Sequence, residues 1–162
     1  RNSASSDLQV SGMQYDLYAA VSEGDFNYVK KLVQAGVPTN YTLRDFGNQT
    51  LLHVATDRGY IDICRLLLAN GAEVDARDSA GNTPLFYAVK SNNMRIVSLL
   101  QGQGADINAK SYFGKTLEDY INPSSGRSHH EILNHLEELG YLQKHKMGLF
   151  TLLEDQLTQE SE

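Results

Sequence analysis

The chain has 162 residues, a formal net charge of −6 and a hydrophobic fraction of 41%. This composition suits one folded domain and excludes wholesale disorder, and no apolar run approaches the roughly 20 residues that span a bilayer. The acidic balance disfavours broad nucleic-acid binding, which usually needs clustered lysine and arginine.

The beginning of the chain and its single cysteine give the first expectations. Residues 1–12 are expected to be a flexible segment, and a start at Arg1 rather than at methionine suggests a piece of a longer chain. Cys64 has no partner for an internal disulfide. A lone cysteine favours a reducing compartment, so the expected location is cytoplasmic, nuclear or both.

A period of 33 residues organises the next part of the chain. Thr50, Thr83 and Thr116 are each 33 positions apart, and so are Gly71 and Gly104. Such periods indicate a repeat architecture. We expect four copies, two closely matched and two degenerate, at about residues 13–43, 44–76, 77–109 and 110–141.

Each copy has the pattern of two short helices and a turn, most clearly in the third copy. Thr83 is expected to cap the first helix with its hydroxyl, and Pro84 suits the first helical position. Leu85, Ala88 and Val89 have the spacing of one buried stripe. Helices this short are marginal alone, so neighbouring copies must stack and bury a shared core.

The two inner copies also share a recognisable motif. The third copy reads GNTPLFYA, IVSLL and GADINA, and the second reads TLLHVA, GYIDICRLLL and GAEVDA. This pattern resembles the ankyrin repeat. The resemblance implies an all-α fold, an α-solenoid of stacked helix-turn-helix repeats with β-hairpin-like loops. It also implies that His53 ties neighbouring loops by hydrogen bonds, whereas Phe86, at the same place one copy later, must act by packing.

The outer copies depart from this pattern. Asn48 replaces the turn glycine of the later copies, and the first hairpin is two residues longer than the next. In the fourth copy Glu118 stands where Leu85 would be, and three extra residues separate the two helices. A distorted last repeat is therefore expected.

Residues 142–162 are expected to form a C-terminal capping helix and an acidic tail. The apolar side chains of this segment fall on one helical face: Met147, Phe150, Leu153 and Leu157. The helix can cover the exposed end of the stack. Alternatively it docks into a partner groove, because it contains a Leu-x-x-Leu-Leu sequence from Leu149 to Leu153.

No residue pattern predicts a catalytic centre, a metal site or a bound cofactor. The GKT at 114–116 lacks the upstream glycine of a phosphate loop, and no Gly-x-Ser-x-Gly elbow occurs. His130 and His135 are five residues apart, which places them on different helical faces. Cys64 falls on an apolar stripe and is expected to be a buried, inert thiol.

Positions that repeat packing does not use are the candidates for partner binding. In a stack of this kind, hairpin tips and first helices line a concave groove, and aromatic and arginine side chains are typical anchors. The candidates are Arg44, Phe46, Gln49, Arg58, Arg77, Ser79, Asn82, Tyr87, Lys110, Tyr112, Phe113 and Lys115. The aromatic tips can either contact a partner or pack laterally against their neighbours and the C-terminal segment.

The resemblance also implies a modification. Ankyrin domains can be hydroxylated at the asparagine of a Leu-x5-Asp-Ile/Val-Asn pattern, which fits the stretch from Leu100 to Asn108. Asp75 holds the equivalent place one copy earlier. Alternatively these side chains only tie the hairpin turns by hydrogen bonds.

We therefore expect a non-catalytic scaffold or adaptor module. It would bind another protein or a peptide as a monomer, without nucleic acid, membrane or cofactor. A targeting or inhibitory domain of a larger enzyme is the alternative, and a free-standing inhibitor would use the same surface. The repeat pattern encodes the scaffold and leaves the partner to the variable positions.

Overall fold

The structure of the chain is a computed structural model, which describes residues 3–121 and 130–140. It consists of two compact units, residues 1–122 and residues 123–162. In chain order the first unit contains α1 (Ser3–Glu23), α2 (Phe26–Gln34), β1 (Thr42–Leu43), the 3-10 helix η1 (Arg44–Phe46), β2 (Gln49–Thr50), α3 (Leu51–Arg58), α4 (Ile61–Ala69), α5 (Pro84–Lys90), α6 (Met94–Gly102) and the 3-10 helix η2 (Leu117–Tyr120). The second unit contains α7 (His130–Glu138).

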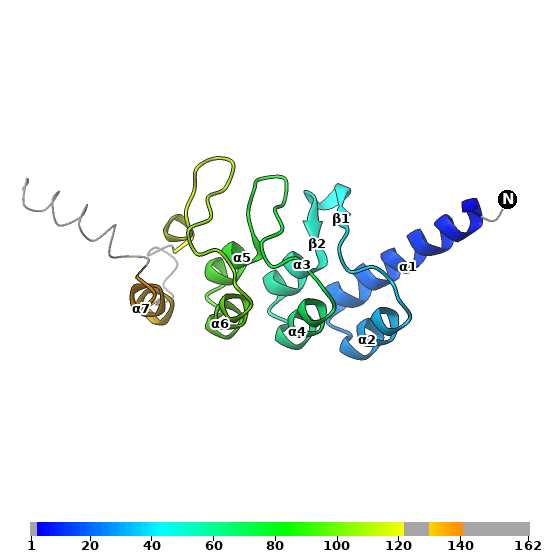
Figure 1. Ribbon diagram of the computed structural model, residues 1–162, viewed down its shortest axis with the longest axis horizontal. Coiled ribbons are helices and arrows are strands. Elements are labelled where there is room, and N and C mark those ends of the chain that lie inside the picture. Colours follow the sequence, from blue (N-terminus) through cyan, green and yellow to red (C-terminus); the bar gives the residue numbers. More distant parts are fainter. Residues whose placement is uncertain (1–2, 122–129, 141–162) are drawn as a thin grey trace, which may run out of the picture. The chain divides into compact units, whose positions relative to one another are not determined.

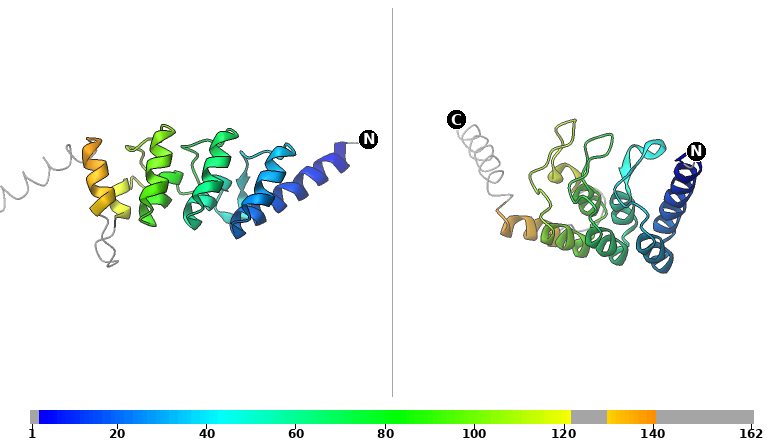
Figure 2. Two further views of the ribbon diagram at one scale, coloured as in Figure 1. Left: turned by 90° about the horizontal axis from the view of Figure 1, so that it is seen from below. Right: turned by 45° about the vertical axis from the view of Figure 1, so that its right-hand side comes forward.

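The helices of the first unit form two layers. α1, α3 and α5 pack side by side, and α2, α4 and α6 form a parallel row behind them (Figure 1, Figure 2). Each helix of the first row also packs on the second helix of its own copy. The loops that join successive copies project together to one side (Figure 1). This arrangement confirms the expected all-α solenoid of helix-turn-helix repeats.

The core of this unit lies between the two rows and between neighbouring copies. The predicted stripe of Leu85, Ala88 and Val89 is completely buried. Equivalent apolar positions in the other helices are buried too, namely Leu17, Leu51, Leu52, Val29, Leu32, Ile63, Leu67, Ile96 and Leu100. Burial of apolar surface between neighbours is therefore what holds the stack together.

The turns between paired helices use residues with positive φ. Gly24, Gly59 and Asn92 stand at equivalent places, with φ of 77°, 78° and 55°. Asn93 then caps α6, because its side chain accepts a hydrogen bond from the Ile96 amide at 3.2 Å. The pair Asn92 and Asn93 thus separates α5 from α6.

Helix α1 differs from its prediction. It runs without interruption from Ser3 to Glu23, whereas residues 1–12 were expected to be a flexible segment outside the repeats. A helix that is nucleated by its packed half propagates at little further cost, and no proline interrupts this stretch. Residue 13, the expected start of the repeat, is therefore not the start of the helix.

The fourth copy is distorted, as expected. The four-residue 3-10 helix η2 replaces a first α-helix after Thr116, and only Leu117 of η2 is buried. In the second unit, α7 presents Ile132 and Leu136 on one buried face. The predicted capping helix and tail at 142–162, and the longer link before α7, lie outside the described residues.

His53 joins the second and third copies. Its side chain is fully buried, and Nδ1 accepts a hydrogen bond from the Thr50 amide at 3.1 Å. Nε2 lies 2.8 Å from the Asn82 carbonyl oxygen, so Nε2 carries the proton and donates it. This neutral tautomer makes the loop-tying contacts that the resemblance implied.

Phe86 takes the place of His53 in the third copy and acts by packing, as predicted. It is buried and meets the Tyr120 ring edge-on, with centroids 5.2 Å apart. The predicted hydroxyl cap of Thr83 is wrong. Among the described residues the Thr83 hydroxyl has no hydrogen-bond partner, since the Phe86 amide donates to the Thr83 carbonyl oxygen at 3.1 Å and Phe86 has no ring nitrogen like the one that faces the Thr50 hydroxyl. Only Pro84 and a backbone hydrogen bond start α5 here.

The buried imidazole predicts a pH dependence of stability. Burial lowers the pKa of His53 in the folded protein below its value of about 6.5 in the unfolded chain. The unfolded chain therefore binds more protons below that pH, so the contribution of His53 to stability is complete above about pH 6.5 and is lost as the pH falls. Urea midpoints of wild type should fall faster between pH 7.5 and 5 than those of His53→Gln. Parallel pH profiles would contradict this assignment, because the two proteins differ only at position 53.

Candidate functional site

The tips of the hairpin loops expose aromatic side chains. Phe46 is 50% exposed, Tyr112 67% and Phe113 78%. Large aromatic side chains are usually buried when the fold alone requires them, and three on one series of loops mark a surface that can contact a partner. Phe113 is the most exposed of the three, and its contact with a partner stays a prediction.

Phe46 and Tyr112 also pack laterally. The Phe46 ring lies 4.9 Å from the Tyr18 ring of α1, and the Arg77 guanidinium lies 6.0 Å from the centre of the Tyr112 ring. The Tyr112 amide additionally donates to the Ala80 carbonyl oxygen at 2.9 Å. Each of these two side chains therefore uses one face for its neighbour and leaves the other in solvent.

Tyr87 is part of a hydrogen-bond chain across two copies. Its hydroxyl accepts from the Gln49 side-chain amide at 2.8 Å and donates to the Asp78 carboxylate at 2.6 Å. Burial, followed by the Asp78 hydrogen bond, raises the pKa of the Tyr87 hydroxyl, which therefore stays protonated. The His53 ring also meets the Tyr87 ring edge-on. Gln49 and Tyr87 thus tie the second copy to the third.

Two further candidates hold neighbouring hairpins together. Arg77 donates to the Gly81 carbonyl at 3.0 Å and to the Lys110 carbonyl at 2.7 Å. The Asn82 side chain accepts from the Tyr120 hydroxyl at 3.1 Å. The remaining polar candidates are exposed, namely Arg44, Arg58, Ser79, Lys110 and Lys115. Partner binding by these residues stays a prediction.

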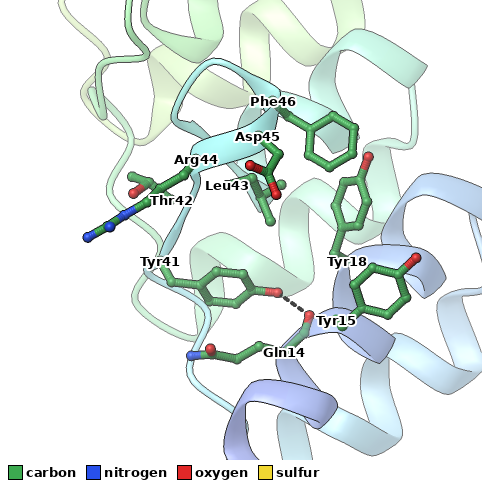
Figure 3. Close-up of a pocket in the computed structure, with 9 residues that line it drawn as sticks. All are labelled: Gln14, Tyr15, Tyr18, Tyr41, Thr42, Leu43, Arg44, Asp45 and Phe46. Atoms are coloured by element: carbon green, nitrogen blue, oxygen red, sulfur yellow. Dashed lines mark hydrogen bonds between the residues drawn. The ribbon is translucent and has the colours of Figure 1, made fainter.

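A pocket that the sequence patterns did not predict lies between α1 and the first hairpin. It has a volume of about 250 Å³. Figure 3 shows the residues that line it: Gln14, Tyr15, Tyr18, Tyr41, Thr42, Leu43, Arg44, Asp45 and Phe46. The Tyr41 hydroxyl donates to the Gln14 carbonyl at 2.5 Å and so fastens the hairpin to α1. The only sequence signal was the greater length of this hairpin.

The described residues contain no evident reactive centre. Burial raises the pKa of the Cys64 thiol to about 11, so the thiol is protonated and inert near neutral pH, as expected. Within the described ranges no group of histidine, cysteine and acidic side chains is placed to hold a metal ion. None of the described helices combines the length and apolar character that a bilayer crossing requires.

Comparison with known proteins settles the family. Residues 17–111 match the family model of ankyrin repeats in three copies, which is more than half of the chain. The chain belongs to the ankyrin repeat family. Ankyrin repeats are protein-interaction modules without catalytic activity of their own, and their stacked copies create an extended concave surface.

Individual ankyrin proteins match this chain over short stretches. Serine/threonine-protein kinase 12 of Arabidopsis thaliana is 44% identical over 63 residues, which are 39% of this chain and 13% of the kinase. The NF-kappa-B inhibitor cactus of Drosophila melanogaster is 36% identical over 58 residues, 35% of this chain and 12% of cactus. Ankyrin repeat domain-containing protein 46 of Rattus norvegicus is 45% identical over 51 residues, 32% of this chain and 22% of that protein. The matched stretches thus span only a small part of each relative.

The ankyrin hairpins also show what the hydroxylation candidates contact. The Asp75 carboxylate accepts from the Asp106 amide at 3.0 Å, and Asn40 ties its hairpin to the next one in the same way, through the Glu73 amide at 3.1 Å. For Asp75 this supports the alternative of a turn-tying residue. Asn108 is exposed, and its backbone amide donates to the Asp106 carboxylate at 2.9 Å. Hydroxylation of Asn108 stays a prediction.

Proposed function

We propose that this chain is a non-catalytic scaffold or adaptor module that binds a segment of another protein along its hairpin tips and first-row helices. The observation that carries the proposal is the exposure of Tyr112 and Phe113 at the tip of the hairpin before η2. Arg77 lies over the inner face of Tyr112, which holds this ring in place while its outer face remains in solvent. A rigid aromatic surface loses little side-chain entropy when it binds.

The rest of the proposed binding surface suits such a role because hydrogen bonds already hold its side chains in place. The chain from Gln49 through Tyr87 to Asp78 and the two bonds donated by Arg77 tie neighbouring copies before any partner arrives. A preorganised surface converts more of its contact energy into affinity than a mobile one does. Exposed Arg58 and Lys90 on the first-row helices provide polar contacts beside these hydrogen-bonded side chains.

The test compares two matched double variants. Tyr112→Ala with Phe113→Ala removes the exposed tip, and Phe26→Ala with Tyr28→Ala removes two similarly large, exposed aromatics from α2, in the other row. Proteins bound to each variant in cells are quantified by mass spectrometry after crosslinking. We expect the tip variant to lose at least about tenfold of its specific partners, as for one or two interface hot spots, and the α2 variant to retain them.

Circular dichroism and thermal unfolding must show that both variants are folded. If the tip variant is folded and retains every partner that wild type binds, the tip is not the binding surface. If the α2 variant loses the same partners, binding uses the opposite row, and the concave surface proposed here is wrong.

The alternative function is a targeting or inhibitory domain within a larger enzyme. The match to a plant serine/threonine-protein kinase over 13% of its length favours this alternative. The match to a protein named as an inhibitor favours the free-standing version. The full-length open reading frame distinguishes the two, since a kinase domain in the same chain would support the first and its absence the second.

A further inference from the structure

The pocket between α1 and the first hairpin combines aromatic rings with one free carboxylate. The rings of Tyr15, Tyr18 and Phe46 form one wall, with centroids 6.5 Å and 4.9 Å apart in succession. In Figure 3 the Asp45 carboxylate is directed into the space between the Tyr41 ring and the rings of Tyr18 and Phe46. Arg44 extends to the opposite side, so its charge does not fill this space.

Asp45 does not accept the turn-closing hydrogen bonds that the equivalent residues of the next two hairpins accept. Asp78 and Ser111 hold the equivalent place in the next two hairpins, and both are buried. The side chain of each accepts two backbone hydrogen bonds, from the amides two and four residues further on, at 2.9 Å for Asp78 and at 3.2 and 3.1 Å for Ser111. Asp45 is exposed, and its carboxylate makes no hydrogen bond or ion pair with any residue that the structure describes.

The first hairpin differs from the next two in its local structure. It is two residues longer, it contains the strand β1 and the 3-10 helix η1, and Asp45 lies within η1 rather than at the start of a tight turn. The Asn48 amide instead donates to the Leu43 carbonyl at 3.0 Å, so the turn is closed by the backbone. The hairpin also carries Tyr41, and burial raises the pKa of its hydroxyl. In this hairpin, therefore, Tyr41 is held against α1 while the Asp45 carboxylate has no turn-closing role.

We propose that this pocket binds a lysine or arginine side chain of a partner segment. This proposal rests on the proposed function, because it states which kind of side chain of the bound segment would contact one end of the binding surface. A cation gains from the negative faces of tyrosine and phenylalanine rings and from a nearby carboxylate. The net charge of −6 also favours the approach of basic segments.

Other occupants fit this pocket less well. An anion would meet the unpaired Asp45 carboxylate. A complete small molecule is disfavoured by size, because the volume of about 250 Å³ is below the roughly 300–1,000 Å³ of typical ligand pockets. A neutral apolar side chain would bury Asp45 without pairing its charge, which is unfavourable.

The test uses short peptides and a ¹⁵N-labelled chain. Backbone amide resonances are followed during titration with acetyl-Gly-Lys-Gly-amide, with the arginine peptide, and with the norleucine peptide as a neutral control of similar length. We expect shifts at residues 14–18 and 41–46 with the basic peptides and far smaller ones with norleucine. Asp45→Asn should weaken binding of the basic peptides by about fivefold, and Tyr18→Leu by a similar factor.

Asp57→Asn is the matched control, because it removes another exposed carboxylate, on α3. It should leave the peptide affinity unchanged. Equal shifts with the norleucine peptide, or equal affinity of Asp45→Asn and wild type, would overturn the proposal. Equal losses in Asp45→Asn and Asp57→Asn would reduce the effect to net charge and would overturn it too. Since the tip variant leaves this pocket intact, failure here does not imply failure of the proposed function.

Discussion

Replacing His53 by alanine should lower the free energy of unfolding by about 3–5 kcal/mol, a large part of a typical total of about 5–15 kcal/mol. The imidazole is fully buried, so its removal leaves a cavity. It also removes the hydrogen bonds that the imidazole makes with the Thr50 amide and the Asn82 carbonyl at 3.1 and 2.8 Å, and of these two groups the Asn82 carbonyl keeps the Asp78 amide as a second partner at 3.1 Å. Urea unfolding followed by circular dichroism measures the change.

His53→Phe separates the two contributions. Phenylalanine is the residue that the third copy uses at this place, in Phe86, and its ring is somewhat larger than the imidazole, so it leaves no cavity. It cannot form either hydrogen bond, so we expect a loss of about 1–3 kcal/mol. If His53→Phe were as stable as wild type, the hydrogen bonds would not matter, and the histidine would act by packing like Phe86.

Gly81→Ala should lower the free energy of unfolding by more than the usual cost of a side chain in the left-handed region. Gly81 has φ of 78°, which costs about 1–2 kcal/mol for a residue with a Cβ. An added Cβ would also lie 2.6 Å from the Tyr112 backbone nitrogen. The next hairpin would have to shift and lose the hydrogen bond from Tyr112 to the Ala80 carbonyl. We expect a total loss of at least about 3 kcal/mol in urea unfolding.

Gly71→Ala is the control for this prediction. Gly71 has φ of 87°, but nothing lies within 4 Å of the position of an added Cβ. It should lose only the backbone part, about 1–2 kcal/mol. Equal losses in the two variants would show that the close approach of neighbouring hairpins at Gly81 adds nothing to stability.

The sequence predicted the parts of this fold that depend on local rules. The period of 33 residues and the apolar spacing of Leu85, Ala88 and Val89 were enough to predict the helices and their buried faces. Positive φ at Asn48 could be predicted because asparagine tolerates this conformation better than most residues. The distorted fourth copy followed from Glu118 at an apolar position.

The candidate site was predicted less completely, because its contacts cross between copies. Tyr87 was selected as a variable residue, but its hydroxyl meets Gln49, 38 positions away in the chain. The Thr83 hydroxyl does not cap α5, because the Phe86 amide donates to the Thr83 carbonyl oxygen instead, and a rule for single positions misses this choice of acceptor. The extra length of the first hairpin was visible in the sequence, but the direction in which it turns Asp45 was not.

The hydrogen bonds between neighbouring copies have a consequence for folding. Among them are the bond from His53 to Asn82, which joins positions 29 apart, and the bonds Gln49–Tyr87 and Tyr120–Asn82, which join positions 38 apart. Closing such loops is entropically cheap, and chains with a low contact order fold quickly. Folding can therefore start at the well-matched second and third copies and spread outward, with the η2 end of the first unit completed last.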